Sequence, residues 1–492
     1  MPAGDLLIGD VFRSAARSVP GRVAAALDGA ELTFSDLDAG ANSYGRALAA
    51  RGVGRGDRVV VWSATNLDTL KVFAGAAKLG AVFAPLSSAL SAGEAAPVAA
   101  AVCPAVLVFD PDRAEAAQQV AARAGATALG LADLAAAAAQ EDAAADLSCG
   151  QLREDDPHVI FFTSGSTGRP KGVVISHRVS YLRTHPGALL EPRGAMVCPY
   201  PLFHMGAWTI ALQQWQARDR VVLLSAFDAA ALGAAIQDHR ATRLNCIPAI
   251  WRRLLDHVQT AAGQALDLSS VRVADTGTSA TPLELLEAIR AAMPNANLRV
   301  FYGSTEAGPV AMLEDGDVTR KPGSCGVVVP TADVRIDVTG ELWVRGPLLF
   351  DGYYDDPAAT AEAVVDGWYR TGDLAEVDDE GYLTIVGRAR DVIRTGGETV
   401  SPLEVEQVLT MHPQVADVAV VGLPDAQWGE VVCAVVVPAD GAAPPELSEL
   451  QAHCAGRLAR FKHPRRLAVV DTLPRTASTN QVQRRLLAER LG

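Results

Sequence analysis

Short runs of β-branched and apolar residues alternate with alanine-rich helical segments through much of this chain. Such runs lie at 56–63, 80–86 and 105–109, and the pattern returns between 157 and 310. Strands that alternate with helices are typical of βαβ units around a parallel sheet. The pattern therefore predicts an α/β fold, and 492 residues are enough for more than one domain.

The pattern changes near residue 330. Short strands and turns follow to about residue 389, which predicts a small β-rich lobe. Residues 390–492 then read as a compact mixture of helices and strands, which includes a helix predicted over 447–461. We therefore predict an N-terminal domain over 1–389 and a C-terminal domain over 390–492.

The composition argues against several classes of protein. The formal net charge is −14 and no basic patch stands out, so nucleic acid is not an expected partner. No apolar run reaches the roughly 18 residues of a membrane span, and the first residues lack the pattern of a signal peptide. The seven cysteines are scattered without a CxxC pair, which favours reduced buried thiols. We expect a cytoplasmic protein.

The stretch FFTSGSTGRPKGV at 161–173 is dense in Gly, Ser and Thr and contains Lys171. Glycines allow tight turns that point backbone N–H groups at an anion, and hydroxyls with a lysine complete an anion cradle. The GxxxxGK[ST] order of a Walker A loop is absent. The chain has only five lysines against 38 arginines, so a lysine kept here indicates a phosphate site more than a polar turn.

Further motifs follow this loop in a fixed order. They are PLFH (201–204), YGSTE (302–306), GELWVRGP (340–347), GWYRTGDL (367–374), GRARD (387–391), TGGETVSPLEVE (395–406), GLPDAQWGE (422–430) and FKHP (461–464). With TSGSTGRPKG, this series resembles the adenylate-forming superfamily, which includes acyl-CoA synthetases, peptide-synthetase adenylation domains and luciferases. The resemblance implies an N-terminal domain of two doubly wound sheet subdomains plus a β-rich lobe, and a mobile α+β C-terminal domain.

The resemblance also implies a reaction in two steps. A carboxylate attacks the α-phosphate of ATP, giving acyl-adenylate and pyrophosphate, and a thiol, usually that of coenzyme A, then attacks the mixed anhydride. The first step develops charge on phosphate oxygens and needs cationic help, whereas the second needs a positioned thiol. The implied ligands are ATP with Mg²⁺, AMP or acyl-adenylate, and coenzyme A.

Matching the motifs assigns roles to individual residues. In YGSTE, Tyr302 would stack on adenine beside Gly303, Thr305 would bond the α-phosphate, and Glu306 would hold Mg²⁺, which prefers oxygen ligands. The residues that would hold the pyrophosphate side of ATP are Thr163, Ser164, Ser166, Thr167 and Lys171.

Three further residues complete the implied site. Asp373 would accept hydrogen bonds from the ribose, Arg388 would reach the nucleotide, and His204 would lie beside the acyl carboxylate and gate the thiol. Taken singly, these residues would favour a structural interpretation, with Tyr302 or His204 as a core residue and Asp373 as a turn residue. Their occurrence in the expected order favours the functional interpretation.

The C-terminal domain of similar enzymes rotates between the two steps, about a hinge that falls here at Arg390 and Asp391. In the thioester-forming pose, Gly396, Gly397 and Glu398 would line the pantetheine tunnel, where glycines let a thin chain pass close to backbone.

One position departs from the family pattern. The adenylating lysine belongs in a tail motif like PRTxxGK, and here PRTASTN places Asn480 at that position. Asparagine carries no charge. We therefore predict an acyl-CoA ligase that uses acyl-adenylate and coenzyme A, with adenylation weak or absent. The adenylate would come from elsewhere, such as a separate adenylating ligase.

Alternatives remain open at this position. Arg484 or Arg485 could move into register and restore adenylation, which would make the protein an ordinary two-step acyl-CoA synthetase. A third hypothesis, of another class, is a catalytically silent protein that binds acyl-adenylate. The thiol could also belong to a carrier protein.

The acyl pocket is predicted around the PLFH motif. The predicted lining is His204, Gly206, Trp208 and Ile210. Aryl-acid ligases similar to this often carry an aromatic residue where Gly206 stands, so the empty volume would suit a bulky or cyclic acyl group, although helix packing explains the glycine equally well. The other wall is predicted to include Thr276, Gly277, Thr278 and Ser279, and the last three are also candidates for cofactor binding.

Overall fold

The computed structural model describes residues 4–164, 170–188, 193–260, 262–439, 441, 443–475 and 481–492. By compactness the chain divides into two units. The first comprises Met1–Asp333 and Arg345–Gly367, and the second comprises Val334–Val344 and Trp368–Gly492. The second unit thus joins most of the predicted β-rich lobe to the C-terminal region, and the domain boundary at 389 stays a prediction.

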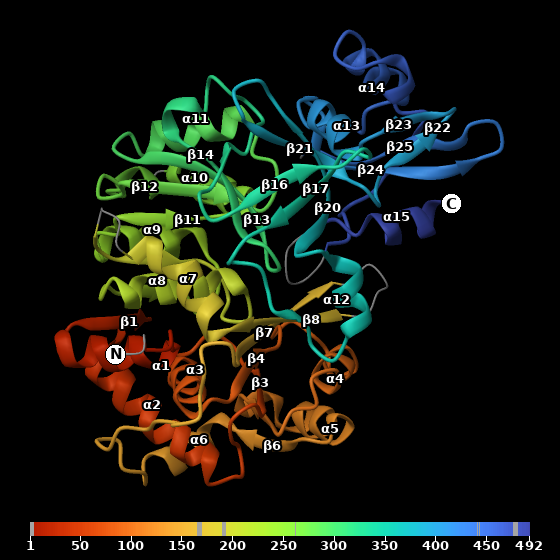
Figure 1. Ribbon diagram of the computed structural model, residues 1–492. Coiled ribbons are helices and arrows are strands. Elements are labelled where there is room, and N and C mark those ends of the chain that lie inside the picture. The colour runs from red at the N-terminus through yellow and green to blue at the C-terminus, as the bar shows by residue number, and fades with distance from the viewer. Residues whose placement is uncertain are drawn as a thin grey trace. The chain divides into compact units, whose positions relative to one another are not determined.

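Two sheets form the frame of the first unit (Figure 1). One has the order β18 (Gly352–Tyr353), β8 (Pro170–Ser176), β7 (Pro157–Ser164), β4 (Val82–Pro85), β3 (Arg58–Trp62), β5 (Val106–Phe109), β6 (Thr127–Gly130). The other has the order β15 (Val327–Val328), β14 (Gly308–Leu313), β13 (Asn297–Ser304), β12 (Val273–Gly277), β11 (Arg243–Asn245), β9 (Met196–Cys198), β10 (Val221–Leu223), β1 (Val23–Leu27), β2 (Ala30–Thr33).

Central strands of both sheets pair in parallel, as βαβ units require, and antiparallel hairpins lie toward the edges. The helices of this unit are α1 (Ile8–Ser18), α2 (Phe34–Ala49), α3 (Leu67–Leu79), α4 (Ala92–Ala100), α5 (Ala114–Ala124), α6 (Leu131–Ala138), α7 (His177–Ala188), α8 (Met205–Gln216), α9 (Ala229–Asp238), α10 (Pro248–Val258), α11 (Leu283–Ala292) and α12 (Pro357–Ala363). Local sequence sets several ends: the Thr33 and Asp36 side chains form a capping box at the start of α2.

Helix α8 contacts strands β9 and β10 of one sheet of the first unit and, through Trp208, strand β4 of the other. The Trp208 ring stacks on Phe73 of α3 with centroids 4.1 Å apart, and it meets the Phe83 ring of β4 edge-on at 5.0 Å. Two turns further along the same helical face, the indole N–H of Trp215 donates to the Ala24 carbonyl of β1. The aromatic core between the sheets therefore fixes the position of α8, and with it the residues at its N-terminus.

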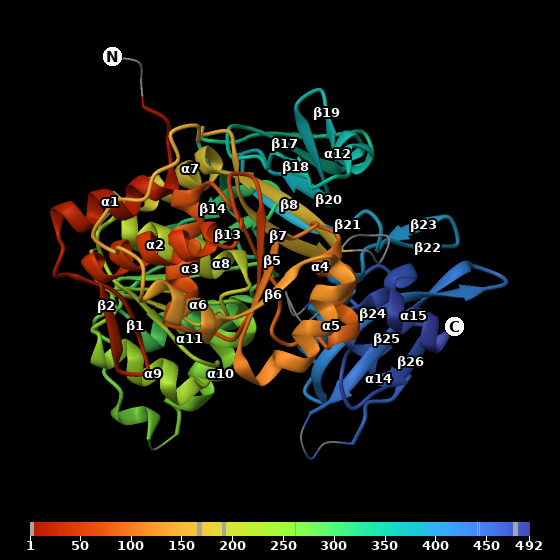
Figure 2. The same ribbon diagram turned by 90° about the horizontal axis from the view of Figure 1, so that it is seen from below.

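The second unit holds two further groups of strands. In the β-rich lobe, β20 (Trp368–Val377) pairs antiparallel with β17 (Glu341–Arg345) and β21 (Leu383–Arg388), and β16 (Asp333–Ile336) lies at the edge of that sheet beside β17. The short strand β19 (Val364–Val365) belongs to the first unit. The C-terminal sheet has the order β23 (Glu398–Val400), β22 (Ile393–Thr395), β25 (Gly429–Pro438), β24 (Val415–Asp425), with β26 (Arg466–Val469) paired to β25. Its helices are α13 (Pro402–Leu409), α14 (Leu447–Cys454) and α15 (Arg484–Leu491). Figures 1 and 2 both show α15 beside β24, where Leu487 joins an apolar cluster with Val421 and Leu473.

The predicted α/β fold, with a large N-terminal part and a small C-terminal part, is confirmed. One element is shorter than predicted: the helical pattern over 447–461 ends at Cys454, and Gly456 two residues later has a φ of +76°, which is incompatible with a continuing helix. Among the described residues, none of the helices combines the length and apolarity needed to cross a bilayer.

Candidate functional site

The phosphate-loop motif lies on a β-hairpin. Thr163 of β7 pairs with Lys171 of β8, so both stand at the end of the hairpin where β7 leads into β8. Ser166 and Thr167 lie outside the described residues, and the Ser164 side chain is not described. The structure thus brings Thr163 and Lys171 together.

The YGSTE motif forms the tip of the hairpin between β13 and β14. Ser304 pairs with Gly308, and the Ser304 hydroxyl accepts a hydrogen bond from the Ala307 N–H at 3.0 Å. A Cβ at Gly303 would lie 2.3 Å from the Gly308 carbonyl oxygen, so the tip requires glycine there. We call Thr305, Glu306 and Ala307 the phosphate tip. Thr305 and Glu306 are both half-buried.

Tyr353 of β18 connects the phosphate tip to the phosphate-loop hairpin. Its hydroxyl donates to Glu306 Oε1 at 3.3 Å, and the Lys171 ammonium lies 4.5 Å from its ring centroid. An ammonium over an aromatic face is held by the ring quadrupole. Three residues far apart in sequence therefore converge in the first unit as a lysine, a phenol and a carboxylate.

This group has the donors that a magnesium nucleotide needs. Within the described residues there is no cluster of three or more His, Cys, Asp or Glu side chains that could hold a metal by themselves. Mg²⁺ in nucleotide sites is usually held by one or two carboxylates together with phosphate oxygens. Glu306 as a single carboxylate near Lys171 fits that pattern, with the phosphates of the substrate supplying the other ligands.

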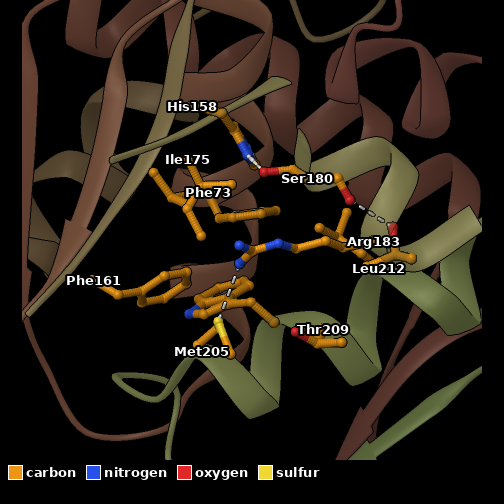
Figure 3. A pocket seen from close by; sticks show the side chains of 12 residues that line it. Phe73, His158, Phe161, Ile175, Ser180, Arg183, Met205, Thr209 and Leu212 are labelled. Atoms are coloured by element: carbon orange, nitrogen blue, oxygen red, sulfur yellow. Dashed lines mark hydrogen bonds between the residues drawn. The ribbon is translucent and has the colours of Figure 1, made fainter. Parts of the chain in front are cut away.

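A buried arginine lies beneath the phosphate tip. Arg183 of α7 is 9% exposed, and it donates to the backbone carbonyl oxygens of Thr305, Glu306 and Leu348 at 2.7–3.0 Å. Figure 3 shows its side chain reaching across a small pocket toward Met205 of α8, with the His158–Ser180 hydrogen bond on another wall. Burial lowers the pKa of Arg183 to about 10, so its guanidinium is charged at neutral pH.

His204 immediately precedes α8. Burial lowers the pKa of its imidazole to about 4, which keeps the ring neutral near pH 7. Two residues on, a Cβ at Gly206 would lie 3.5 Å from the Tyr200 ring, an ordinary contact distance. Trp208 and Ile210, predicted as pocket residues, are 2% and 4% exposed; Trp208 lines the pocket in Figure 3 and also belongs to the aromatic core.

The predicted second wall follows β12. A Cβ at Gly277 would lie 2.5 Å from the Phe301 carbonyl oxygen of β13, so only glycine allows the two strands this approach. Thr278 has a left-handed φ of +72°, unusual for a β-branched residue, and Ser279 is exposed. Backbone strain of this kind is common at binding sites.

Two predicted nucleotide contacts pair with each other in the second unit. Asp373 and Arg388 are register partners across β20 and β21, and their side chains form an ion pair at 2.7 Å. Asp373 is 5% exposed, whereas about 40% of the Arg388 side chain is exposed. The ion pair with Arg388 therefore orients the Asp373 carboxylate, and the Arg388 side chain stays partly exposed.

The TGGE motif forms the turn between β22 and β23. Gly396 and Gly397 have φ of +61° and +86°, and the Gly396 N–H donates to the Trp428 carbonyl at 2.8 Å. The Glu430 carboxylate accepts the Arg394 N–H at 2.7 Å. Trp428 and Glu430 of the GLPDAQWGE motif thus hold this glycine turn by hydrogen bonds.

The predicted hinge contacts the C-terminal helix of the same unit. Arg390 lies 3.6 Å from Asp391, which also pairs with Arg484 at 3.2 Å. Arg484 donates to Glu406 at 2.7 Å as well. Asn480 lies outside the described residues, but the chain on either side of it is held: Arg475 pairs with Val482 as a β-bridge, and its side chain binds Asp417 at 2.7 Å.

Sequence reasoning missed Arg183 and Tyr353. Tyr353 lies just after the GELWVRGP motif, in GYY, without any chemical signal of its own. A signal for Arg183 existed in α7, where His177, Ser180 and Thr184 are buried and polar at helical spacing. Such a stripe indicates a polar site inside the protein.

Comparison with known proteins agrees with this geometry. Residues 12–354 match the model of the AMP-binding enzyme family, and residues 404–480 match the AMP-binding enzyme C-terminal domain. The chain is 35% identical to a feruloyl-CoA synthase of Amycolatopsis sp, covering 94% of this chain and 95% of the relative. It is 32% identical to the long-chain-fatty-acid–CoA ligase FadD13 of Mycobacterium tuberculosis, covering 93% of both chains.

A solved structure has the same fold over nearly the whole length. ATP-bound MatB from Rhodopseudomonas palustris superposes with a TM-score of 0.88 at 29% identity, covering 98% of each chain. The family match spans most of the chain, and the motif residues form compact groups in the structure. The chain therefore belongs to the AMP-binding enzyme family.

Proposed function

We propose that this protein is an acyl-CoA ligase that transfers the acyl group of an acyl-adenylate to coenzyme A and makes the adenylate from acid and ATP only slowly. The observation that carries the proposal is Asn480, which stands where the family pattern has lysine. The relatives named above are CoA ligases or synthases, which supports the acyl transfer.

The two half-reactions depend differently on this position. In the first, a carboxylate oxygen attacks the α-phosphorus and pyrophosphate leaves, so charge on the phosphate oxygens needs a cation. Loss of one preorganised charge contact costs roughly 10²–10³ in rate. In the second, the thiol sulfur attacks the acyl carbon, the bond to the phosphate oxygen breaks, and AMP leaves while the thiol proton passes to solvent. That step does not use the tail lysine.

The arginines that could replace the lysine have other partners. Arg484 pairs with Glu406 and Asp391, and Arg485 pairs with Glu489 at 2.7 Å. Moving Arg484 would leave Glu406, which is 9% exposed, without its cation, and an unpaired buried charge is unfavourable. This arrangement supports weak adenylation over rescue by an arginine.

Two rival functions make different predictions. An ordinary two-step synthetase would form thioester from acid, ATP and coenzyme A as fast as from the preformed adenylate. A silent adenylate-binding protein would form thioester from neither. The supported glycine turn of TGGE favours a thiol-using enzyme over the silent protein, because binding alone needs no path for pantetheine.

The test compares two sets of substrates on the same purified protein. Feruloyl, indoleacetyl and long-chain acyl groups, the acids of the curated relatives, provide the panel. We expect thioester formation from acyl-AMP and coenzyme A to exceed that from acid, ATP and coenzyme A by about 10²-fold or more. Equal rates would refute the proposal.

A gain-of-function variant tests the cause. Asn480→Lys should raise ATP–pyrophosphate exchange by about 10²-fold and leave acyl transfer from the preformed adenylate unchanged. The matched control is Asn480→Gln, which restores length without charge and should leave exchange at the wild-type level.

A further inference from the structure

We propose that Arg183 is a positioning residue that fixes the backbone of the phosphate tip and thereby aims Thr305 and Glu306 at the nucleotide. The inference rests on the proposed function only in that the tip binds a nucleotide. It assigns a role to a side chain in none of the motifs recognised from the sequence.

The guanidinium joins three segments that are distant in sequence. Its Nη1 donates to the Thr305 carbonyl at 2.9 Å and its Nη2 to the Glu306 carbonyl at 3.0 Å, while Nε and Nη2 both donate to the Leu348 carbonyl at 2.9 and 2.7 Å. The second Nη1 proton points to the Met205 sulfur at 3.7 Å. One rigid planar group therefore fixes the carbonyls of Thr305 and Glu306, the two residues proposed to bind the phosphates and Mg²⁺.

These contacts use all five N–H donors of an arginine. Arg183 therefore has no donor left for a substrate carboxylate or phosphate, although it carries a charge close to the site. This excludes direct anion binding and leaves positioning as its function.

Stability alone does not explain an arginine at this place. Burying a cation is costly, and replacing buried ionic groups by apolar ones of similar volume is often neutral or stabilising. The surrounding side chains Phe73, Phe161, Ile175 and Trp208 could contact an apolar residue equally well (Figure 3). A planar fork offers fixed directionality to several carbonyls, which an apolar side chain cannot supply.

The tip is shaped to receive this fork. Gly308, at the start of β14, has a φ of +70°, and a Cβ there would lie 3.0 Å from the Arg183 Nε. The Glu306 carbonyl also accepts the Phe350 N–H at 2.7 Å, so two donors hold one oxygen. The glycine and the double acceptor together place the Glu306 peptide in one orientation.

The experiment compares Arg183→Met, Arg183→Lys and the control Arg178→Met. Arg178 lies on the same helix, pairs with Glu154 at 3.5 Å and is about 42% exposed at its side chain. We measure AMP binding by calorimetry in the full-length protein, and kcat and KM for acyl transfer from acyl-AMP to coenzyme A. Circular dichroism verifies that each variant is folded.

We expect Arg183→Met to weaken AMP binding about tenfold and to lower kcat about 10²-fold, while KM for coenzyme A changes less than threefold, because a misplaced catalytic group affects kcat more than substrate contacts elsewhere. Arg183→Lys should recover part of both losses, and Arg178→Met should match the wild type. If the methionine variant does not fold, the lysine variant carries the test, because an ammonium has three donors and no planar fork and cannot reproduce the five contacts of the guanidinium.

Two outcomes overturn the inference separately from the proposed function. Wild-type AMP affinity and kcat in a folded Arg183→Met or Arg183→Lys protein would refute the positioning role alone. A wild-type protein that binds neither AMP nor acyl-AMP would refute the proposed function and the inference with it.

Discussion

The phosphate tip of the first unit and the TGGE turn of the second are both glycine-flanked hairpin ends that carry a glutamate, yet they are supported in opposite ways. The phosphate tip is held through its carbonyls by the buried Arg183 guanidinium. The TGGE turn is held through one N–H and by contact with the Trp428 ring, and its glycines are exposed. The difference fits the two proposed roles, because a tip proposed to bind phosphates needs aimed side chains, whereas a turn proposed to line a pantetheine tunnel needs bare backbone.

The variant with the largest expected effect disrupts the backbone of the phosphate tip. Gly303→Ala places a Cβ 2.3 Å from the Gly308 carbonyl oxygen, which cannot move without opening the hairpin. We expect the unfolding free energy to fall by about 3 kcal/mol, at the upper end for overpacking, and AMP binding to weaken with it. Chemical denaturation and calorimetry measure both. Wild-type stability in this variant would show that the tip is not tightly closed.

The second effect concerns the pH dependence of stability in the first unit. Burial lowers the pKa of His177, in the first unit, to about 4 from its ordinary value of 6.5. Because the folded-state pKa is the lower one, the unfolded chain takes up the proton first as pH falls. The stability from the neutral ring is complete above about pH 6.5 and is lost as pH falls toward 4, roughly 2 kcal/mol of it by pH 5.

His177→Asn keeps the acceptor that the Ile8 N–H uses at His177 Nδ1, at 3.2 Å, and removes the titration. The stability difference between wild type and variant should therefore shrink between pH 7.5 and 5, as measured by urea unfolding with tryptophan fluorescence. His257→Asn on α10 is the control and should follow the wild type. A constant difference between wild type and His177→Asn would contradict the prediction.

The third effect concerns the TGGE turn alone. Gly396→Ala would place a Cβ 2.7 Å from the Trp428 ring and strain a residue at φ +61°. We expect kcat/KM for coenzyme A to fall about tenfold, equivalent to roughly 1.4 kcal/mol, while the affinity for AMP stays unchanged. Steady-state kinetics from preformed acyl-AMP measure this. A tenfold loss of AMP affinity in this variant would mean that the phosphate tip and the TGGE turn are not supported independently.

The smallest effect comes from the neighbouring glycine. Gly397 also has a positive φ, but a Cβ there meets nothing within 4 Å. Gly397→Ala should cost about 1 kcal/mol of stability from backbone strain alone and change kcat/KM less than twofold. Comparison with Gly396→Ala separates the effect of the clash with the Trp428 ring from that of the positive φ, which both glycines share. Similar kinetics in the two variants would show that the clash has no effect of its own.

The sequence predicted well whatever depends on local pattern. The β-branched runs gave β3, β4, β5 and β7, and the glycines of TGGE predicted a turn that the structure forms. The helix expected over 447–461 was overextended because composition favoured a helix past Gly456. The grouping of the β-rich lobe with the C-terminal region depends on contacts between segments, which no local pattern reveals.

The site was predictable where a motif carries it and not where tertiary contacts build it. Thr163, Lys171 and Glu306 follow from motifs, but Arg183 meets Leu348 across 165 positions of sequence. An arginine on a helix normally indicates a solvated face, and its burial here depends on carbonyls from a distant hairpin and loop. Tyr353 joins Lys171 to Glu306 only because β18 lies at the edge of the sheet beside β8.

Because the peptide dipoles of Thr305, Glu306 and Leu348 all converge on Arg183, the guanidinium is electrically compensated from within the protein. An acidic ligand tail that enters the pocket of Figure 3 would therefore meet carbonyl oxygens around the cation. The guanidinium would have no N–H left to donate to the ligand carboxylate. An engineer who wants this enzyme to take a dicarboxylic acid would have to introduce a second cation, because the one already present is fully committed to the backbone.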